Sequence, residues 1–466
     1  MVEEYDLIII GSGSGNTLIT PEWASKKVCI LEAGTFGGTC LNAGCIPTKQ
    51  YVYPATLAYQ ASHLDKLGLK AQVTQVDWPA IRDRIFTRID AISAQGAEYR
   101  RQSKNVSLIP EKAHFVASHR LETSSGRILT APNIVIAAGS SNKLPDIPGI
   151  NLPQVHSSDT IMRIEEQPKE ILIIGGGFVA AEFSHIFNGL GSQVTQVNRS
   201  QTLLRSYDQE VVARYTEQIS QRWQLKLDHT VTALEPAAKN RIKAHLSHGG
   251  QRVSLEADLV LFASGRQANT AGLRAADFFD LGPEQNLQVD AYQRVLAQGK
   301  PVPGIFALGD VCSETMLKHL ANAQARIVAH NLTHPDQLQA RDQRFVPSAV
   351  FSHPQLAMVG LTQEQAEQRA RAEGFDITVK VQEYADVAYG WAMEDQGGMC
   401  KLIARKDTGQ LLGAHLLGEQ ASVLIQPLIQ AMSFEQPVQN LARGQYWIHP
   451  ALTEVVENAL LGLELD

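Results

Sequence analysis

Two cysteines, Cys40 and Cys45, lie five positions apart in the stretch GGTCLNAGCIPTK, residues 37–49. A separation of five residues around the first turn of a helix brings two Cα atoms within reach of a disulfide. The start of a helix favours a thiolate, and Lys49 adds positive charge beside the pair. The glycines of this stretch let the backbone approach a flat ligand closely. Two buried structural cysteines would fit poorly in so polar a setting, so the pattern predicts a redox-active disulfide.

The composition sets limits on the kind of protein. A chain of 466 residues is too long for one core and predicts two or three domains. A net charge of −7 gives no basic excess to attract nucleic acid or anionic lipid, and no apolar run is long enough to span a membrane. The first residues, MVEEYDLIIIG, are unlike a secretion signal, and five cysteines do not make a disulfide scaffold, so we expect a cytoplasmic protein. No second cysteine pair completes a metal site, so no metal is predicted.

Two segments share one design, an apolar strand that ends in a glycine turn. They are YDLIIIGSGSGN (residues 5–16) and EILIIGGGFVAAEF (residues 170–183). A buried parallel strand, a glycine turn and a helix form the usual binding site for the diphosphate of a dinucleotide. One copy alone would also suit a tight turn without a ligand, but two copies favour two dinucleotide sites. The turn residues predicted to bind cofactor are Gly11, Gly13, Ser14, Gly15, Gly175, Gly177 and Ala180.

The residues that end the following strands distinguish the two ligands. Glu32 ends the strand KVCILEAG (residues 27–34), where a carboxylate reaches a ribose hydroxyl such as that in the adenosine half of FAD. The second copy has no acid there and continues with Asn198 and Arg199, with Arg205 close behind. Arginine at this place favours a ribose 2′-phosphate, so NADPH is preferred over NADH. A solvated basic turn is the other interpretation of the two arginines.

The first glycine turn departs from the usual pattern. Asn16 stands where a third glycine normally allows close packing of helix on strand. We therefore expect the first helix to be displaced or loosened, and Pro21 agrees with an irregular helix.

Three further apolar runs predict buried strands that end in small residues. They are NIVIAAGS (133–140), DLVLFASGR (258–266) and GIFALGD (304–310). Asp310 is placed to accept a ribitol hydroxyl of a flavin or to cap the next helix. The cofactor-binding residues predicted here are Gly139, Gly265, Arg266, Gly309 and Asp310.

From about residue 343 the pattern changes to that of a separate α+β domain. The turn DTGQ (407–410) predicts a hairpin, and an apolar stretch predicts a long helix over 421–434. The final segment has apolar and aromatic residues at helical spacing, which suits either a core or burial against a second subunit.

The order of the motifs resembles the flavoprotein disulfide reductases throughout the chain. GGTCLNAGCIPTK resembles their redox-active disulfide motif, and ALGD (307–310) and HPALTE (449–454) also match. The resemblance implies an α/β fold with two Rossmann-like domains, for FAD and NADPH, and a C-terminal α+β dimerisation domain. The expected boundaries are 1–148 with 271–342 for the FAD domain, 149–270 for the NADPH domain and 343–466 for the dimerisation domain.

The same resemblance implies a role for each residue of the redox site. Cys45 is expected to lie against the flavin as a charge-transfer thiolate, and Cys40 is expected to attack the substrate. Lys49 is expected near flavin N5, paired with Glu182. The remaining cofactor contacts near the pair are Gly38 and Thr39.

His449 and Glu454 match the acid–base dyad of the family, in which the glutamate orients the imidazole and raises its basicity. In the family this dyad reaches the cysteines of the partner subunit, so the resemblance implies a homodimer with shared active sites. Without the resemblance, His449 would be read as an ordinary packed or surface histidine.

Longer segments resemble the mycothione-reducing branch of the family, which implies a small-molecule disulfide as substrate. They are PEWASKK (21–27), YADVAYGWAMED (384–395) and ARGQYWIHPALTEVVENALLGL (442–463). Tyr389, Trp391, Tyr446 and Trp447 offer flat faces for sugars, although core packing explains them equally well. Three other interpretations stay open: a reductase of glutathione disulfide or a lipoyl group, a flavin transhydrogenase or quinone reductase, and a flavin-bearing assembly subunit.

Overall fold

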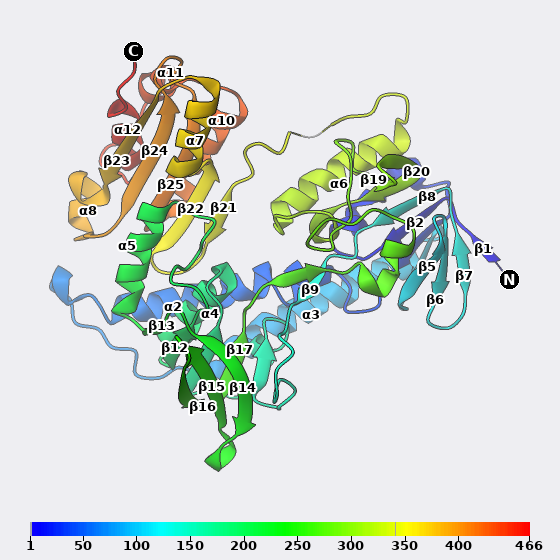
Figure 1. Ribbon diagram of the computed structural model, residues 1–466, viewed down its shortest axis with the longest axis horizontal. Coiled ribbons are helices and arrows are strands. Elements are labelled where there is room, and N and C mark those ends of the chain that lie inside the picture. The colour runs from blue at the N-terminus through cyan, green and yellow to red at the C-terminus, as the bar shows by residue number, and fades with distance from the viewer. Residues whose placement is uncertain (1, 341) are drawn as a thin grey trace.

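Apolar runs in the N-terminal third form the centre of a six-stranded sheet. The computed structural model describes residues 2–340 and 342–466 (Figure 1). The sheet has the order β19-β20-β8-β2-β3-β4, and β2, β3, β4, β8 and β20 pair in parallel. The central strands are buried on both faces, as their unbroken apolar sequences predict. The strands are β2 (Leu7–Ile10), β3 (Val28–Leu31), β4 (Val106–Ile109), β8 (Asn133–Ile136), β19 (Arg294–Ala297) and β20 (Lys300–Ala307).

A second parallel sheet follows the second glycine turn and has the order β10-β17-β11-β12-β13. Helix α4 (Phe178–Gly189) runs between β11 and β12, and α5 (Gln209–Ser220) runs between β12 and β13, which is the alternation of a Rossmann-like unit. The strands are β10 (Val155–Ser157), β11 (Glu170–Ile174), β12 (Gln193–Val197), β13 (Gln224–Lys226) and β17 (Leu259–Phe262).

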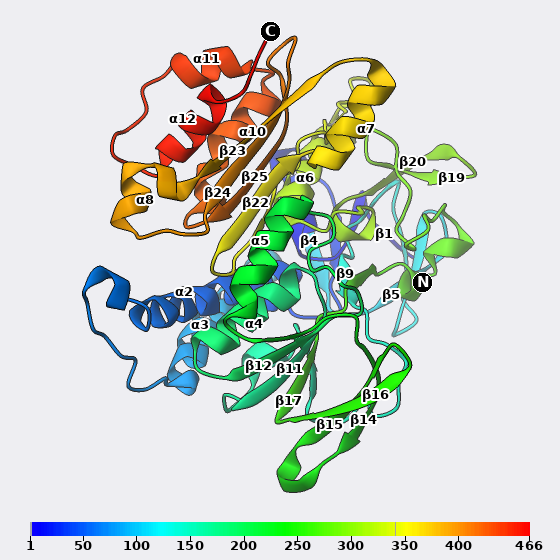
Figure 2. The ribbon, with the colours of Figure 1, turned by 60° about the vertical axis from the view of Figure 1, so that its left-hand side comes forward.

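Three smaller sheets complete the N-terminal and central parts. The order β1-β7-β6-β5 lies beside the first sheet, β14-β15-β16 projects from the second, and β9 pairs with β18 where the chain crosses between the two parts (Figures 1 and 2). Their strands are β1 (Val2–Glu4), β5 (Ala113–Ala117), β6 (Arg120–Thr123), β7 (Ile128–Thr130), β9 (Ser140–Asn142), β14 (Thr230–Pro236), β15 (Ile242–His248), β16 (Gln251–Ala257) and β18 (Arg266–Ala268).

The C-terminal part is an antiparallel sheet of order β21-β22-β25-β24-β23 with helices packed on it. The predicted turn at 407–410 joins β24 and β25. The strands are β21 (Ser348–Val350), β22 (Gln355–Gly360), β23 (Ile377–Glu383), β24 (Met399–Arg405) and β25 (Leu411–Gly418), and the helices are α7 (Gln363–Glu373), α8 (Ala388–Ala392), α9 (Ala421–Leu424), α10 (Gln426–Ser433), α11 (Val438–Arg443) and α12 (Thr453–Leu461).

The expected long helix over 421–434 is wrong, because the chain forms two helices, α9 and α10, on either side of Ile425. Pro427 explains the break. It has no N–H to continue the hydrogen-bond ladder, so it sits in the first turn of a new helix.

The expected loosening of the first helix is confirmed and goes further than a displacement. The first glycine turn is followed by two short 3₁₀ helices, η1 (Ser14–Leu18) and η2 (Pro21–Trp23), and by no α-helix before β3. The guanidinium of Arg100 donates to the Asn16 side-chain Oδ1 at 2.7 Å and to the Asn16 carbonyl at 2.9 Å. These bonds from α3 (Trp78–Gln102) hold the chain in the tight turn.

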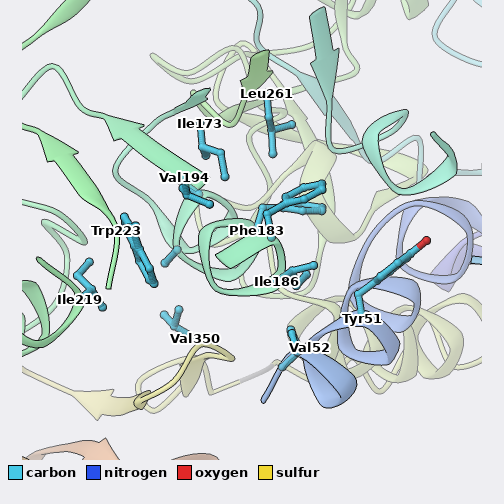
Figure 3. Close-up of a cluster of buried hydrophobic side chains, with 14 of the residues drawn as sticks. Tyr51, Val52, Ile173, Phe183, Ile186, Val194, Ile219, Trp223, Leu261 and Val350 are labelled. Atoms are coloured by element: carbon cyan, nitrogen blue, oxygen red, sulfur yellow. The ribbon is translucent and has the colours of Figure 1, made fainter. Parts of the chain in front are cut away.

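The helix that carries the second cysteine is fixed by a core shared with the central part. Helix α2 (Cys45–Ala61) packs against α4. Figure 3 shows Tyr51 and Val52 of α2 near Ile186 of α4, with Val350 of β21 in the same cluster. A buried ion pair of 2.8 Å between Lys401 Nζ on β24 and Asp208 Oδ1, the N-cap of α5, joins the central part to the C-terminal sheet. Within the residues described, no helix is long and apolar enough to cross a membrane.

Candidate active site

The cysteine pair lies at a break between two helices. Cys40 lies on α1 (Gly38–Asn42), and Cys45 is the first residue of α2. Both are free thiols; Cys40 is partly buried and Cys45 is exposed. A Cβ atom at Gly44 would come within 3.0 Å of the Thr39 carbonyl and 3.3 Å of the Cys40 Cα. A side chain at this position would require the backbone around Cys40 to shift by a few tenths of an ångström, so glycine suits the close approach of the two helices.

The two thiols have opposite electrostatic surroundings. The hydrogen bond with Cys40 lowers the pKa of Cys45 to about 7. Partial burial of the thiol opposes this shift, and the positive charge of Lys49 adds to it. The same hydrogen bond, together with burial, raises the pKa of Cys40. Negative charge on the reduced pair therefore concentrates on Cys45, at the positive end of α2.

Lys49 forms an ion pair that connects α2 to α4. Its Nζ atom lies 2.7 Å from Glu182 Oε2, and the Glu182 side chain is almost fully buried. The expected contact between Lys49 and Glu182 is therefore present. The backbone N–H of Phe351 donates to Glu182 Oε1 at 3.0 Å, and the Phe351 ring lies 4.7 Å from Lys49 Nζ. Phe351 and Gly44 escaped the sequence analysis because both act through tertiary contacts that leave no spacing pattern.

The glycines of the first turn allow neighbouring parts of the chain to approach the turn closely. Gly11 has a φ of +106°, and a Cβ there would lie 2.3 Å from the Ala137 carbonyl. Gly13 and Gly38 face each other so closely that a Cβ on Gly38 would lie 2.8 Å from the Gly13 Cα. Gly15 packs on Ile9 in the same way. Glycine at these positions lets the turn pack closely against its neighbours, as the strand–turn motif of a dinucleotide-binding site requires.

Glu32 lies at the edge of a cavity of about 300 Å³ at the end of β3. Its carboxylate accepts hydrogen bonds from the Ser12 N–H and hydroxyl, at 2.9 and 2.6 Å, and from the Gly34 N–H at 2.8 Å. The cavity is also lined by Phe36 and by residues of α3, among them Ala97. A cavity of this size with a fixed carboxylate at its edge fits the adenosine half of FAD.

Asp310 and Arg266 meet through a shared partner, Ser140. The Ser140 hydroxyl donates to Asp310 Oδ2 at 2.6 Å and accepts from Arg266 Nε at 2.8 Å. Gly139 precedes Ser140 and Gly309 precedes Asp310, each with positive φ. The structure thus brings together four predicted cofactor residues from distant parts of the chain. Ser140 is an addition that the sequence analysis missed, although it follows a strand-end glycine.

The second glycine turn is followed by a regular helix, α4. Gly175 has a φ of +147°, and a Cβ there would lie 2.3 Å from the Ala263 carbonyl, whereas Gly177 and Gly265 face open space. Ala180 is buried in the first turn of α4. This open surface at a helix start fits the diphosphate of a nicotinamide dinucleotide.

The loop after β12 carries the predicted 2′-phosphate residues. The Asn198 amide donates to the Ser200 and Thr202 carbonyls, at 2.9 and 3.0 Å. Asn198 therefore shapes the loop from inside, while Arg199 and Arg205 are exposed.

His449 and Glu454 form a hydrogen-bonded pair at the start of α12. His449 Nδ1 lies 2.7 Å from Glu454 Oε1, and this bond lowers the pKa of Glu454. The His449 side chain is 73% exposed, so Nε2 is accessible. In the described chain no hydrogen bond or ion pair joins this pair to the cysteines, and Figures 1 and 2 place α12 on the C-terminal sheet, away from α2.

The four aromatic residues divide into two groups. Tyr446 and Trp391 are highly exposed and Tyr389 is also exposed, whereas Trp447 packs against the C-terminal core and donates to the Ala442 carbonyl at 3.0 Å. Their contact with a substrate stays a prediction.

Two family models cover nearly the whole chain. Residues 5–325 match "Pyridine nucleotide-disulphide oxidoreductase", and residues 346–460 match the dimerisation domain of the same family. The chain belongs to the pyridine nucleotide-disulphide oxidoreductase family. It is an NAD(P)-dependent flavoprotein disulfide reductase, with an α/β fold and a C-terminal dimerisation domain.

Individual members of this family are similar to the chain over nearly its full length. The chain is 46% identical to "Mycothione reductase" of Mycobacterium tuberculosis over 99% of its own length and 100% of the relative. It is 30% identical to "Dihydrolipoyl dehydrogenase" of Synechocystis over 98% of each chain. Among solved structures, the HOCl-induced flavoprotein disulfide reductase RclA from Escherichia coli superposes with a TM-score of 0.84 at 27% identity, covering 98% of this chain and 100% of that one.

Proposed function

We propose that this protein is an NADPH-dependent reductase of mycothione, the disulfide of the thiol mycothiol. The observation that carries the proposal is the cysteine pair with its Lys49–Glu182 ion pair, in a chain 46% identical over its full length to a mycothione reductase. The pair supplies two adjacent sulfur atoms, one of which is biased toward the thiolate. Thiol–disulfide exchange requires an attacking thiolate and a second sulfur that resolves the mixed disulfide, and the pair provides both.

The cysteines carry out the exchange in two steps. The Cys40 thiol gives its proton to the His449–Glu454 pair as its sulfur attacks one sulfur of the substrate disulfide, which forms a mixed disulfide and releases the first mycothiol. Cys45 then attacks the Cys40 sulfur, which releases the second mycothiol and leaves the Cys40–Cys45 disulfide. Lys49 stabilises negative charge on Cys45. Bound FAD supplies the electron pair, taken as hydride from NADPH, that opens this disulfide for the next cycle.

The two glycine turns would hold the two dinucleotides. The first turn, with Gly11, Gly13, Ser14 and Gly15, holds the FAD diphosphate, Glu32 holds the adenosine ribose, and Asp310 holds the ribitol chain. The second turn holds NADPH, with Arg199 and Arg205 on its 2′-phosphate. The other contacts predicted on FAD or NADPH are Gly38, Thr39, Gly139, Gly175, Gly177, Ala180, Asn198, Gly265, Arg266 and Gly309.

The acid–base pair would act across a homodimer. With His449 Nδ1 donating to Glu454, Nε2 would take the proton of the Cys40 thiol and give it to the first departing mycothiol, and would take a proton from solvent for the second. Because His449 lies away from the cysteines of its own chain, the shared site requires a second copy. The match of residues 346–460 to a dimerisation domain supports this arrangement. We propose a cytoplasmic homodimer whose domains are 1–148 with 271–342, 149–270 and 343–466.

Turnover with three disulfides tests the substrate. The purified protein is given NADPH and, separately, mycothione, glutathione disulfide and lipoamide, and NADPH oxidation is followed. We expect kcat/KM for mycothione to exceed the other two by at least about 100-fold. Comparable turnover of glutathione disulfide or lipoamide would contradict the substrate assignment and leave the class intact.

A further inference from the structure

The two glycine turns of this chain differ in how they can hold a diphosphate. The second turn leads directly into α4, a regular helix of 12 residues whose first N–H groups point toward the turn. The first turn leads into η1, five residues of 3₁₀ helix, and then into Thr20 and Pro21. A full α-helix provides aligned peptide dipoles and free N–H groups for an anion, and a single short turn provides far less of both. The first turn therefore lacks a source of positive charge that the second turn has.

A lysine from another part of the chain lies against the first turn. Lys318 is the first residue of α6 (Lys318–Thr333), and its Nζ atom donates to the Ser14 hydroxyl at 2.8 Å. The Ser14 hydroxyl in turn donates to Asn322 Oδ1 at 3.0 Å, one turn further along α6. Ser14 is buried and lies in the glycine turn itself. Helix α6 and the first glycine turn are thus joined through one serine hydroxyl.

Among the described residues, the Lys318 ammonium group has no carboxylate partner within 4 Å. Across the described residues, no ion pair within 4 Å includes Lys318, in contrast to Lys49, which is paired with Glu182. Its place at the first position of α6 is also unfavourable, because a cation there faces the positive end of the helix dipole. A half-buried, unpaired cation at this end of a helix is stabilised when an anion binds beside it.

We propose that Lys318 binds the diphosphate of FAD at the first glycine turn and supplies the positive charge that a helix supplies at the second. Ser14 holds the ammonium group at the turn before FAD binds. Arg100 donates two hydrogen bonds to Asn16 in the same turn. The inference rests on the proposed function only in that FAD is the cofactor, and it holds for any disulfide substrate.

The lysine also lies close enough to Cys40 to affect it. The hydrogen bond with Cys45 and burial raise the pKa of Cys40, and the charge of Lys318 opposes them. A role on Cys40 alone is therefore the competing explanation. If Lys318 binds the diphosphate, removal of its charge weakens the binding of FAD. If Lys318 acts on Cys40 alone, removal of its charge changes only the ionisation of the Cys40 thiol.

FAD affinity of the full-length protein tests the proposal. FAD release from the holoenzyme is followed by the fluorescence of the freed cofactor in wild type, Lys318→Met, Lys318→Arg and Arg326→Met. Arg326 is an exposed residue of the same helix, so Arg326→Met is a control for the loss of one charge. We expect Lys318→Met to raise the Kd of FAD about 10- to 100-fold, because a charge-assisted hydrogen bond is lost. Lys318→Arg restores most of the affinity, and Arg326→Met leaves it unchanged.

Three further measurements distinguish a contact between Lys318 and the diphosphate from a general effect of the substitution on the protein. The KM for NADPH should not change in Lys318→Met, since the second turn has its own helix. The salt dependence of FAD binding should become shallower. The apoprotein of Lys318→Met should melt at the same temperature as the wild-type apoprotein.

Two results would overturn the proposal. One is an FAD affinity for Lys318→Met equal to that of Arg326→Met, and a shifted pH dependence of Cys40 alkylation in the same variant would then assign the lysine to the thiol. The other is a drop in apoprotein melting temperature that accounts for the whole loss of FAD, which would make Lys318 structural. A failure of the mycothione assay would not affect this test, because FAD release and melting are both measured without substrate.

Discussion

The five cysteines show how surroundings, rather than residue type, decide reactivity. Cys29 and Cys312 are buried, which raises the pKa of each to about 12, and burial raises the pKa of Cys400 as well. Cys45 has the opposite shift because a second thiol and a helix start lie beside it. Only the pair in the glycine-rich stretch can therefore exchange disulfides at neutral pH.

The ionisation of Cys45 gives a pH prediction. In the reduced protein, the ultraviolet thiolate absorbance should rise with a midpoint at about 7, because Cys45 is protonated below that pH and ionised above it. Cys40→Ala removes the hydrogen bond that contributes most to the shift, so the midpoint should move upward. The buried-thiol control, Cys312→Ala, should leave the midpoint in place. A midpoint that stays the same or falls in Cys40→Ala would show that Cys40 does not stabilise the thiolate.

The dyad gives a second prediction at this scale. His449→Ala should lower kcat for mycothione by about 10²- to 10⁴-fold, since proton transfer to the departing thiol is lost. Glu454→Gln keeps a hydrogen-bond acceptor for Nδ1 but loses the charge, so it should cost about 10-fold. Stopped-flow reduction of bound flavin by NADPH should keep its wild-type rate in both. A matching slowdown of that half-reaction would place His449 at the nicotinamide side.

Among the elements, strands were easier to predict than helices. The unbroken apolar runs that end in glycine correspond to β2, β11 and β17, because a strand buried on both faces needs no polar alternation. The local residues Asn16 and Pro21 predicted an irregular first helix, but the hydrogen bonds from Arg100, which lies 84 positions from Asn16, could not be predicted. The contacts of Gly44 and Phe351 likewise depend on how helices approach one another. Such long-range contacts leave no trace in local spacing, and only the family resemblance suggested the Lys49–Glu182 pair.

The loop after β12 gives a prediction about coenzyme choice. Arg199→Ala combined with Arg205→Ala should raise KM for NADPH about 10- to 100-fold and leave KM for NADH nearly unchanged, because only NADPH carries the 2′-phosphate. The ratio of kcat/KM for the two coenzymes measures this. Arg252→Ala, an exposed arginine on β16 of the same part, is the matched control. Equal losses for both coenzymes would mean that the arginines only support the loop.

At the scale of the whole molecule, a shared active site predicts complementation between inactive subunits. Cys40→Ser and His449→Ala subunits are each inactive alone, but a mixed dimer contains one site with wild-type cysteines and a wild-type histidine from opposite subunits. Random mixing of equal amounts makes half of the dimers mixed, so activity should recover to about a quarter of wild type. The measurement is NADPH oxidation after the two proteins are unfolded and refolded together. Continued inactivity of the mixture would show that each chain uses its own dyad.

Trapping of the mixed disulfide tests the central claim most directly. Reduced Cys45→Ser protein is incubated with mycothione and analysed by intact mass and peptide mapping, with Cys40→Ser in parallel. The account predicts that Cys45→Ser retains one mycothiol on Cys40 and releases one, because serine cannot complete the exchange, and that Cys40→Ser retains none. An adduct on Cys45 in the Cys40→Ser protein, with none on Cys40 in the other variant, would contradict it.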